Sequence, residues 1–398
     1  MPWSEVSSMD QRKFLIDDYI NGDFTITELA ARFGVSRKTA YKWIGRFEEE
    51  GRPGLSDRSR RPASCPSQTP GHIVDEILAL RRRHPLWGAK KLLAILSERR
   101  PQIDWPSRST VCDLLKRNGM VQAKRRRTYP GHPGQPTTSF DAPNGIWCAD
   151  FKGEFKTGDG YYCYPLTVTD GFSRYLLGCK GLYSTAHEGT KPLFRRLFQD
   201  YGMPLAIRTD NGAPFATTAL SRLSRLSVWW IRLGIFPELI EPGCPQQNGR
   251  HERMHRTLKA HTARPPASSL RSQQRRFNDF LVEYNELRPH EALGMKPPVS
   301  VYRPSQRQMP SRLPEVTYPD HFEVRLVSNN GGIRWNSRWV NISHVLKKQY
   351  VGLEEVGDGI FDVHFGFLRL GRFDCDDYKL EDALGRKSRK KVLPMSSD

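Results

Sequence analysis

Residues 146–182 read IWCADFKGEFKTGDGYYCYPLTVTDGFSRYLLGCKGL, and this stretch decides the predicted fold of the middle of the chain. Apolar and aromatic residues dominate 146–155, 161–169 and 175–182, and glycine turns at 158–160 and 170–171 separate them. Runs of this kind between turn residues are typical of β-strands. The short connections predict three consecutive antiparallel strands.

The following segments alternate between helical and strand-like patterns. We expect a helix over 188–201, a buried strand over 205–210, another helix, a strand over 235–240 and a helix over about 246–259. The order βββ-α-β-α-β-α predicts an α/β domain with a mixed five-stranded sheet.

Three carboxylates in this domain are candidates for chemistry. Asp150 lies in the first strand, Asp210 closes the fourth strand before a glycine turn, and Glu252 lies on the last helix. Burying an unpaired carboxylate is costly, so carboxylates at strand ends favour a functional role. Together they would offer the oxygen ligands that Mg²⁺ or Mn²⁺ prefers, and two such ions can support an in-line phosphoryl displacement. Glu252 also shares its predicted helix face with Arg256 and Lys259, which can hold phosphates.

Two helical modules precede this domain. In the first, Thr25 and Glu28 form a capping-box pattern, and Ser36 can cap a third helix after the Gly34 turn. A capped helix that follows a tight turn and begins with basic residues is typical of a helix-turn-helix. The second module repeats the pattern, with Ser107 as the cap. The alternatives are a plain three-helix bundle and a helical spacer with solvated charges. The candidate DNA contacts of the modules and of the basic run after them are Arg37, Lys38, Thr39, Tyr41, Lys42, Arg108, Ser109, Thr110, Lys116, Lys124, Arg125, Arg126 and Arg127.

The charge of the chain points to a polyanionic partner. Its 398 residues carry 62 Lys and Arg against 43 Asp and Glu, a net charge of +19. Residues 1–143 and 144–309 each contribute +9, and residues 310–398 contribute +1. Nucleic acid fits this balance, whereas a membrane span would need an apolar run of about 20 residues that the sequence lacks. Seven cysteines without a CxxC pair argue against a zinc finger or disulfide framework and predict a cytoplasmic protein.

The C-terminal region returns to strand patterns, over 321–326, 332–340, 350–356 and 359–370. Short strands with glycine turns predict a small β-barrel of SH3-like type, with Trp335, Trp339, Phe365 and Phe367 in its core. Its near-neutral charge suits contacts with protein as well as phosphate. The predicted organisation is a helix-turn-helix domain (1–52), a linker (53–70), a second helix-turn-helix domain (71–123), a basic linker (124–143), the α/β core with a helical tail (144–305), a linker (306–320), the barrel (321–375) and a flexible basic tail (376–398).

Four motifs in the core resemble those of one family. WCADFKG at 147–153, RTDNGAPF at 208–215 and PQQNGRHERMHRTLK at 245–259 are similar to the three catalytic blocks of DDE transposases of bacterial insertion sequences. YNELRPHEAL at 284–293 resembles their tail motif, and the helix-turn-helix modules also match. These transposases belong to the retroviral-integrase-like superfamily, so the resemblance, which covers residues 10–305, implies an RNase H-like core.

The resemblance implies a function and a site. Asp150, Asp210 and Glu252 would be the catalytic triad and hold two Mg²⁺ or Mn²⁺ ions. A transposase of this kind would bind the terminal inverted repeats of its element, cleave the ends by metal-dependent hydrolysis to give 3′-OH groups, and join them to target DNA by direct transesterification. It would act as a homo-oligomer on double-stranded DNA, associated with the bacterial nucleoid. The rival functions are a catalytically inert DNA-binding regulator and an RNase H-type nuclease.

Some neighbouring residues compete with the triad or have structural explanations. The 41 residues between Asp210 and Glu252 are more than is usual in the family, and we expect 216–226 to lengthen a helix there. Glu238 and Glu241 are the rivals of Glu252. The other polar residues of interest are Asp170, predicted to be a turn carboxylate; His251 and His255, predicted to face DNA or be structural rather than bind zinc; Cys148, predicted to be a packed thiol; and His290, predicted to fasten the tail helix.

Overall fold

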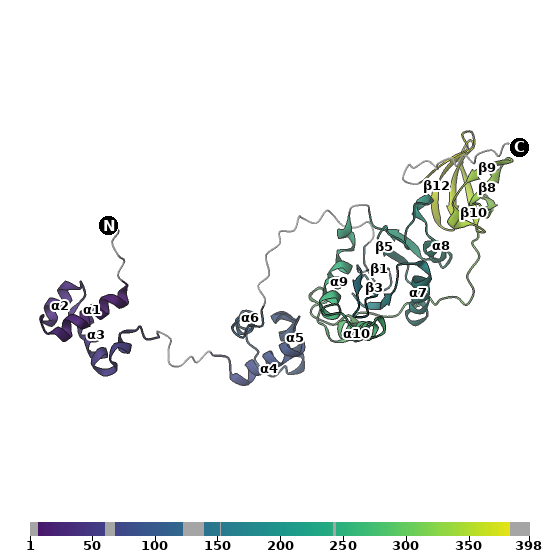
Figure 1. Cartoon of the computed structure of the whole chain (residues 1–398). Helices are drawn as coiled ribbons and strands as arrows, with labels where there is room; N and C mark the ends of the chain where they lie inside the picture. The colour runs from purple at the N-terminus through teal and green to yellow at the C-terminus, as the bar shows by residue number, and fades with distance from the viewer. Residues whose placement is uncertain (1–6, 60–67, 122–138, 152, 242–243, 383–398) are drawn as a thin grey trace. The chain divides into compact units, whose positions relative to one another are not determined.

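The computed structural model describes residues 7–59, 68–121, 139–151, 153–241 and 244–382 (Figure 1). Contacts divide the chain into two compact units, Met1–Pro70 and Gly71–Asp398. The division falls at the end of the linker predicted over 53–70. Within the described ranges, no helix has both the length and the apolar character that crossing a membrane requires.

The first unit is a small helical domain with its own core. It contains α1 (Ser8–Asn21), α2 (Ile26–Arg32), α3 (Arg37–Glu50) and the 3₁₀ turn η1 (Arg52–Leu55). The predicted caps are present, because Thr25 and Glu28 form a capping box on α2 and the Ser36 side chain accepts from the Thr39 N–H. The core residues are Leu15, Ile16, Ala30, Ala40, Trp43, Ile44 and Leu55.

A second three-helix module opens the second unit. It consists of α4 (Gly71–Arg83), α5 (Ala89–Arg99) and α6 (Arg108–Arg117), and Ser107 caps α6 as predicted. Its helices pack around a separate cluster that includes Ile77, Trp87 and Leu92. Both modules therefore have the three-helix architecture that the capping signals predict.

The α/β core is built on a mixed sheet. Its strands are β1 (Ile146–Phe151), β2 (Phe155–Lys156), β3 (Tyr162–Asp170), β4 (Leu176–Leu182), β5 (Ala206–Thr209) and β6 (Phe236–Leu239). The main order is β4-β3-β1-β5-β6, and the two-residue β2 pairs with the start of β3. Strands β1, β3 and β4 pair antiparallel, whereas β1, β5 and β6 pair parallel.

Helices cover both faces of this sheet (Figure 1). On one face α7 (His187–Tyr201) and α8 (Arg225–Arg232) pack against Trp147, Ala149, Leu166, Val168 and Ile207. On the other, α9 (Gly249–Thr262) and α10 (Leu270–Val282) pack against Cys163, Leu176 and Cys179. Because strand side chains alternate between faces, Cys148 and Asp150 belong to the α9 face. The remaining turns of the core are η2 (Leu220–Arg222), η3 (Pro245–Asn248), the π-helical turn η4 (Glu283–Leu287), η5 (Glu291–Leu293) and η6 (Pro298–Ser300).

Two expectations for the core are wrong in detail. The strand expected over 146–155 ends at Phe151, and 155–156 form the separate β2, which makes six strands in the described sheet instead of five. The segment 216–226 does not lengthen a helix. Ser221 and Arg222 have positive φ, and α8 begins only at Arg225, after the Ser224 cap. Leu223 instead packs into the C-terminal hydrophobic cluster, a contact that no local pattern reveals.

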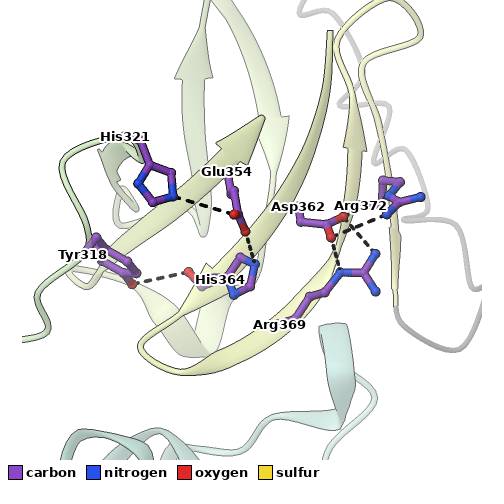
Figure 2. A network of polar contacts seen from close by, with 7 residues as sticks. All are labelled: Tyr318, His321, Glu354, Asp362, His364, Arg369 and Arg372. Atoms are coloured by element: carbon purple, nitrogen blue, oxygen red, sulfur yellow. Dashed lines mark hydrogen bonds and ion pairs between the residues drawn. The ribbon is translucent and has the colours of Figure 1, made fainter. Parts of the chain in front are cut away.

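The C-terminal region consists of two antiparallel sheets around one core. The five-stranded sheet has the order β13-β12-β11-β10-β7, and the other is the hairpin β8-β9. The elements are β7 (Glu323–Leu326), β8 (Gly332–Trp335), β9 (Arg338–Asn341), η7 (His344–Leu346), β10 (Tyr350–Gly357), β11 (Ile360–Phe365), β12 (Leu368–Asp374) and β13 (Lys379–Asp382). A polar network that includes Glu354 and Asp362 lies on the five-stranded sheet (Figure 2).

Several strand expectations in this region need correction. The runs 332–340 and 359–370 are each a hairpin, because Asn336, Ser337 and Gly366 adopt positive φ and reverse the chain. Strand β13 lies inside the range expected to be a tail, and residues 383–398 lie outside the described part of the chain. Trp335 and Phe365 are core residues as expected, whereas Trp339 and Phe367 are about half exposed, at 48% and 51%.

Candidate active site

The pairing of β1 with β5 aligns the two aspartates. The parallel register pairs Ile146 with Ala206, Trp147 with Ile207 and Cys148 with Arg208, an offset of 60 residues. The same offset carries Asp150 to the level of Asp210, which directly follows β5. Neighbouring strands lie about 4.8 Å apart, so this register, continued by two residues, places Asp150 and Asp210 next to each other at the carboxyl ends of the strands. Both side chains are partly exposed, Asp150 at 26%.

The turn after β5 fits closely around Asp210. The Gly212 N–H donates to Asp210 Oδ1 at 3.2 Å. A Cβ atom at Gly212 would lie 3.2 Å and 3.4 Å from the two carboxylate oxygens. Glycine at this position therefore leaves the carboxylate room in its observed orientation.

Helix α9 packs on the sheet through two buried histidines. His251 contacts Thr167 Oγ1 through Nε2 at 2.7 Å and Thr169 Oγ1 through Nδ1 at 2.8 Å. His255 contacts Thr167 Oγ1 through Nε2 at 2.6 Å, and its Nδ1 lies 3.6 Å from Asp150 Oδ2. Burial lowers the pKa of His251 to about 3. Both histidines are buried in the packing of α9 on the sheet, so the DNA-facing alternative is wrong.

Glu252 occupies the first turn of α9 and is exposed. It precedes His255 by three residues, so the two Cβ atoms lie about 5–6 Å apart on the helix surface. His255 lies beside Asp150, so the backbone of Glu252 lies about one turn of α9 away from that contact. Arg256 and Lys259 are also exposed on α9, in the spacing that the sequence predicts.

Among the described residues, no group of three or more His, Cys, Asp and Glu side chains is arranged to hold a metal ion. The strand register thus places Asp150 and Asp210 at neighbouring strand ends, and Glu252 lies on the helix that packs against the same sheet face. The two aspartates fit a divalent cation in chemistry, since both offer partly exposed carboxylate oxygens at adjacent strand ends.

A buried ion pair supports the site from β5 to β6. Arg208 is 1% exposed, and its Nε and Nη2 donate to Glu238 Oε2 and Oε1 at 2.9 Å and 3.2 Å. Arg208 Nη1 also donates to the Gln247 carbonyl at 3.5 Å, at the turn before α9. Glu238, a predicted rival of Glu252, is therefore engaged in a structural pair. Glu241, the other rival, is not part of that pair. Its backbone N–H donates to Gln247 Oε1 at 2.9 Å.

Other polar residues near the site have structural explanations. Asp170 accepts hydrogen bonds from the Asn144 N–H, the Ser173 N–H and the Ser173 hydroxyl at 2.7, 2.8 and 2.6 Å, which confirms a turn carboxylate. Burial raises its pKa. Cys148 is a packed thiol, and burial raises its pKa to about 12. His290 is half-buried and lies edge-on against Tyr284, at 4.8 Å between ring centroids, in the tail that follows α10.

Most predicted DNA-contact residues in the described ranges are exposed. On α3, Arg37, Lys38, Tyr41 and Lys42 are exposed, whereas Thr39 is half-buried and its hydroxyl contacts the Ser36 cap at 2.9 Å. On α6, Arg108, Ser109 and Lys116 are exposed and Thr110 is half-buried. Lys124, Arg125, Arg126 and Arg127 lie outside the described residues.

Comparisons with known proteins agree with this architecture. Two models described as an integrase core domain match residues 141–245 and 233–298. A helix-turn-helix domain matches residues 11–63, and a homeodomain-like domain matches residues 39–115. The chain is 27% identical over 253 residues to the "Insertion element IS476 uncharacterized 39.2 kDa protein" of Xanthomonas euvesicatoria, covering 62% of this chain and 68% of that protein. The chain thus contains an integrase core domain and helix-turn-helix domains, and it is similar to proteins of bacterial insertion elements.

Further relatives of the chain come from insertion elements and retroviruses. It is 28% identical over 190 residues to the "Insertion element IS407 uncharacterized 31.7 kDa protein" of Burkholderia multivorans, covering 46% of this chain and 60% of that one. It is 35% identical over 117 residues to the Pol polyprotein of Radiation murine leukemia virus, covering 29% of this chain and 19% of that one. The HTLV-2 integrase catalytic core domain in complex with magnesium aligns at 20% identity and a TM-score of 0.32, over 41% of this chain and 98% of that one. The predicted family resemblance is confirmed.

Sequence patterns did not single out the threonines that hold α9 on the sheet or pair them with the histidines. Thr167 and Thr169 are two apart on β3 and share a sheet face, and His251 and His255 are four apart and share a helix face. Those two periodicities were the available signal. What pairs them is the packing of α9 on β3, which joins residues more than 80 positions apart.

Proposed function

We propose that the chain is a DNA transposase that binds the terminal inverted repeats of its element, cleaves the ends and joins them to target DNA. The observation that carries this proposal is the alignment of Asp150 and Asp210 at adjacent strand ends, on the sheet face that α9 covers. Divalent cations, when bound there, would stabilise the charge that develops on the oxygens of the phosphoryl group under attack.

The residues of the chain would divide the work. Asp150 and Asp210 would hold the cations, and Glu252 would complete the ligand set by turning inward from the first turn of α9. Arg256 and Lys259, exposed on the same helix, would hold DNA phosphates next to the reacting bond. The site contains no activated nucleophilic side chain among these residues, so the attacking groups would be water for cleavage and the DNA 3′-OH for joining.

The other parts of the chain would recognise and assemble DNA. The exposed basic residues of α3 and α6 would contact the terminal repeats. The protein would act in the bacterial cytoplasm on nucleoid DNA, and an oligomer of at least two chains would hold both ends of the element. We take the C-terminal sheets to be an SH3-like barrel, with near-neutral charge suited to protein contacts.

A metal-dependent cleavage assay tests this function. With labelled element-end DNA and Mn²⁺, Asp150→Asn should abolish nicking and leave DNA binding unchanged, because the change removes a charge and keeps the shape of the side chain. Glu188→Gln, which neutralises an exposed carboxylate at the start of α7, is the matched control and should nick normally.

The same assay separates the rival functions. An inert DNA-binding regulator would bind the ends without nicking in any variant. An RNase H-type nuclease would cleave an RNA–DNA hybrid in preference to duplex DNA. Nicking that survives Asp150→Asn would contradict the proposed site.

A further inference from the structure

A row of buried polar side chains runs from the centre of the sheet to the candidate site. Its members are Thr169, His251, Thr167 and His255, in that order of contact, and the row ends at the Asp150 carboxylate. The four side chains are at most 6% exposed, whereas Asp150 at the end is 26% exposed. The row thus connects the buried contact between α9 and β3 to the partly exposed carboxylate of Asp150.

With both rings neutral, one order of protons satisfies these contacts. An imidazole nitrogen that faces an ionised carboxylate carries the proton, so His255 Nδ1–H faces Asp150 Oδ2 at 3.6 Å, an electrostatic contact that is longer than a hydrogen bond. His255 Nε2 then accepts from the Thr167 hydroxyl at 2.6 Å, and Thr167 Oγ1 accepts from His251 Nε2–H at 2.7 Å. His251 Nδ1 in turn accepts from the Thr169 hydroxyl at 2.8 Å.

A competing contact does not disturb this order. Thr167 Oγ1 also lies 3.2 Å from the Asp150 carbonyl oxygen, and the hydroxyl has one proton. The contact with His255 is 0.6 Å shorter, so the ring nitrogen is the preferred acceptor. Thr167 is also paired with Asp150 in the β1–β3 register, which fixes its hydroxyl next to the Asp150 backbone.

We propose that this row, through His255, positions the Asp150 carboxylate for cation binding and ties that position to α9, the helix that carries Glu252. The proposal rests on the proposed function. His255 and Thr167 are positioning residues, because they act through Asp150 and need not touch DNA or the cation. A residue that contacts a metal-ligating side chain orients it, and replacing such a residue typically changes metal affinity by about 10–100-fold.

The placement of the row explains why it should do more than fasten a helix. A row that only satisfied buried polar groups could end on any buried acceptor. This one ends on a partly exposed oxygen of a candidate cation ligand, and its histidines flank Glu252 on the same helix. A change within the row should therefore alter cation binding more than it alters the stability of the fold.

Two pairs of variants test the proposal in the full-length chain. Thr167→Val keeps the shape and removes the hydroxyl, whereas Thr167→Ser keeps the hydroxyl. His255→Gln places an amide near the Nε2 position and loses the group that faces Asp150, whereas His255→Asn keeps an amide near the Nδ1 position. Thr190→Val is the matched control, because Thr190 is a fully buried threonine on α7 that donates to the Ala186 carbonyl at 3.0 Å, away from the row.

The readouts are Mn²⁺ binding measured directly by electron paramagnetic resonance, the Mn²⁺ dependence of nicking, thermal melting and DNA binding without metal. Thr167→Val and His255→Gln should weaken Mn²⁺ binding by about 10-fold or more. Thr167→Ser and His255→Asn should restore most of it, and DNA binding should not change.

Three outcomes are distinguishable. If Thr167→Val and His255→Gln bind Mn²⁺ like Thr190→Val, the row is structural and the proposal is wrong. If the unmodified chain neither binds Mn²⁺ nor nicks DNA, the proposed function fails first. If Thr167→Val does not fold, the comparison of His255→Gln with His255→Asn decides in its place, and equal Mn²⁺ affinity in that pair overturns the proposal.

Discussion

At the scale of single residues, the shape of the Asp210 turn depends on Gly212. A Cβ at this position would lie 3.2 Å from Asp210 Oδ2 and 3.4 Å from Oδ1, closer than most Cβ atoms approach a neighbour. Gly212→Ala should therefore displace the carboxylate by a few tenths of an ångström. We expect nicking to fall roughly 10-fold or more, since small misplacements of reacting groups are costly, while DNA binding holds.

The control for this change is Gly249→Ala at the start of α9, where an added Cβ has no neighbour within 4 Å. Both variants should be assayed for single-turnover nicking at saturating Mn²⁺. Equal rates in the two variants would show that Asp210 tolerates the displacement or plays no part in cleavage.

The residues of the candidate site were predictable to different degrees. Asp150, Asp210 and Glu252 could be chosen from local signals, namely strand ends, a glycine turn and a helix face. The buried Arg208–Glu238 pair and the threonine–histidine row could not, because each depends on which strand or helix lies next to which. Strand register depends on which segments pair in the folded chain, so it cannot be predicted from the sequence near either partner alone.

At the scale of elements, Asp362 holds two strands of the C-terminal sheet together. Its carboxylate on β11 pairs with Arg369 at 2.7 Å and Arg372 at 2.9 Å on β12, and Asp362 lies opposite Arg372 in the strand register (Figure 2). Burial opposes ionisation of Asp362, but the hydrogen bonds from Arg372 and Arg369 outweigh it and lower the pKa overall.

This pairing predicts how the C-terminal sheets respond to substitution and to acid. Asp362→Asn should destabilise them by about 1–2 kcal/mol, because it removes charge-assisted hydrogen bonds. With a lowered pKa in the folded state, the contribution of Asp362 is present above the ordinary carboxyl pKa of about 3.9 and is lost as the pH falls through the folded value. Asp362→Asn should therefore flatten the acid side of the stability curve.

Chemical denaturation followed by tryptophan fluorescence at several pH values measures this effect. Glu323→Gln is the control, because its ion pair with Arg325 is exposed and should contribute little. If Asp362→Asn had the same free energy of unfolding as Glu323→Gln at neutral pH, the prediction would be wrong.

The elements that the sequence predicted well are those set by local chemistry. Helices α2, α3 and α6 begin at the expected caps, because capping uses residues three positions apart. The β8–β9 hairpin was missed because its turn uses Asn336 and Ser337 at positive φ, without the Asn-Gly or Asp-Gly pair that is typical of two-residue turns. Segment 216–226 was missed because its structure depends on a hydrophobic cluster more than 100 residues away.

At the scale of the whole molecule, positive charge is spread over the first three quarters of the chain, whereas the first unit has a hydrophobic core of its own. Net positive charge is shared almost equally between residues 1–143 and 144–309, so the proposed DNA-recognition modules and the proposed catalytic core are both basic. The hydrophobic core of the first unit, in contrast, contains residues of that unit alone among the described positions. The first unit should therefore fold and unfold by itself, and its loss should affect which DNA is bound rather than how DNA is cut.

Ile44→Ala tests this independence. Ile44 is 4% exposed in the core of the first unit, and truncating a buried isoleucine typically costs about 2–5 kcal/mol, a large fraction of the stability of so small a domain. Calorimetry should show one transition moved to lower temperature and the main transition unchanged. Specific binding to element ends should weaken, because α3 is no longer held in place by the core of the first unit. Mn²⁺-dependent nicking of non-specific duplex should persist. Ile20→Ala, at a position on α1 that is 57% exposed, should leave both transitions in place. A main transition that fell together with the first in Ile44→Ala would mean that the two units share their stability.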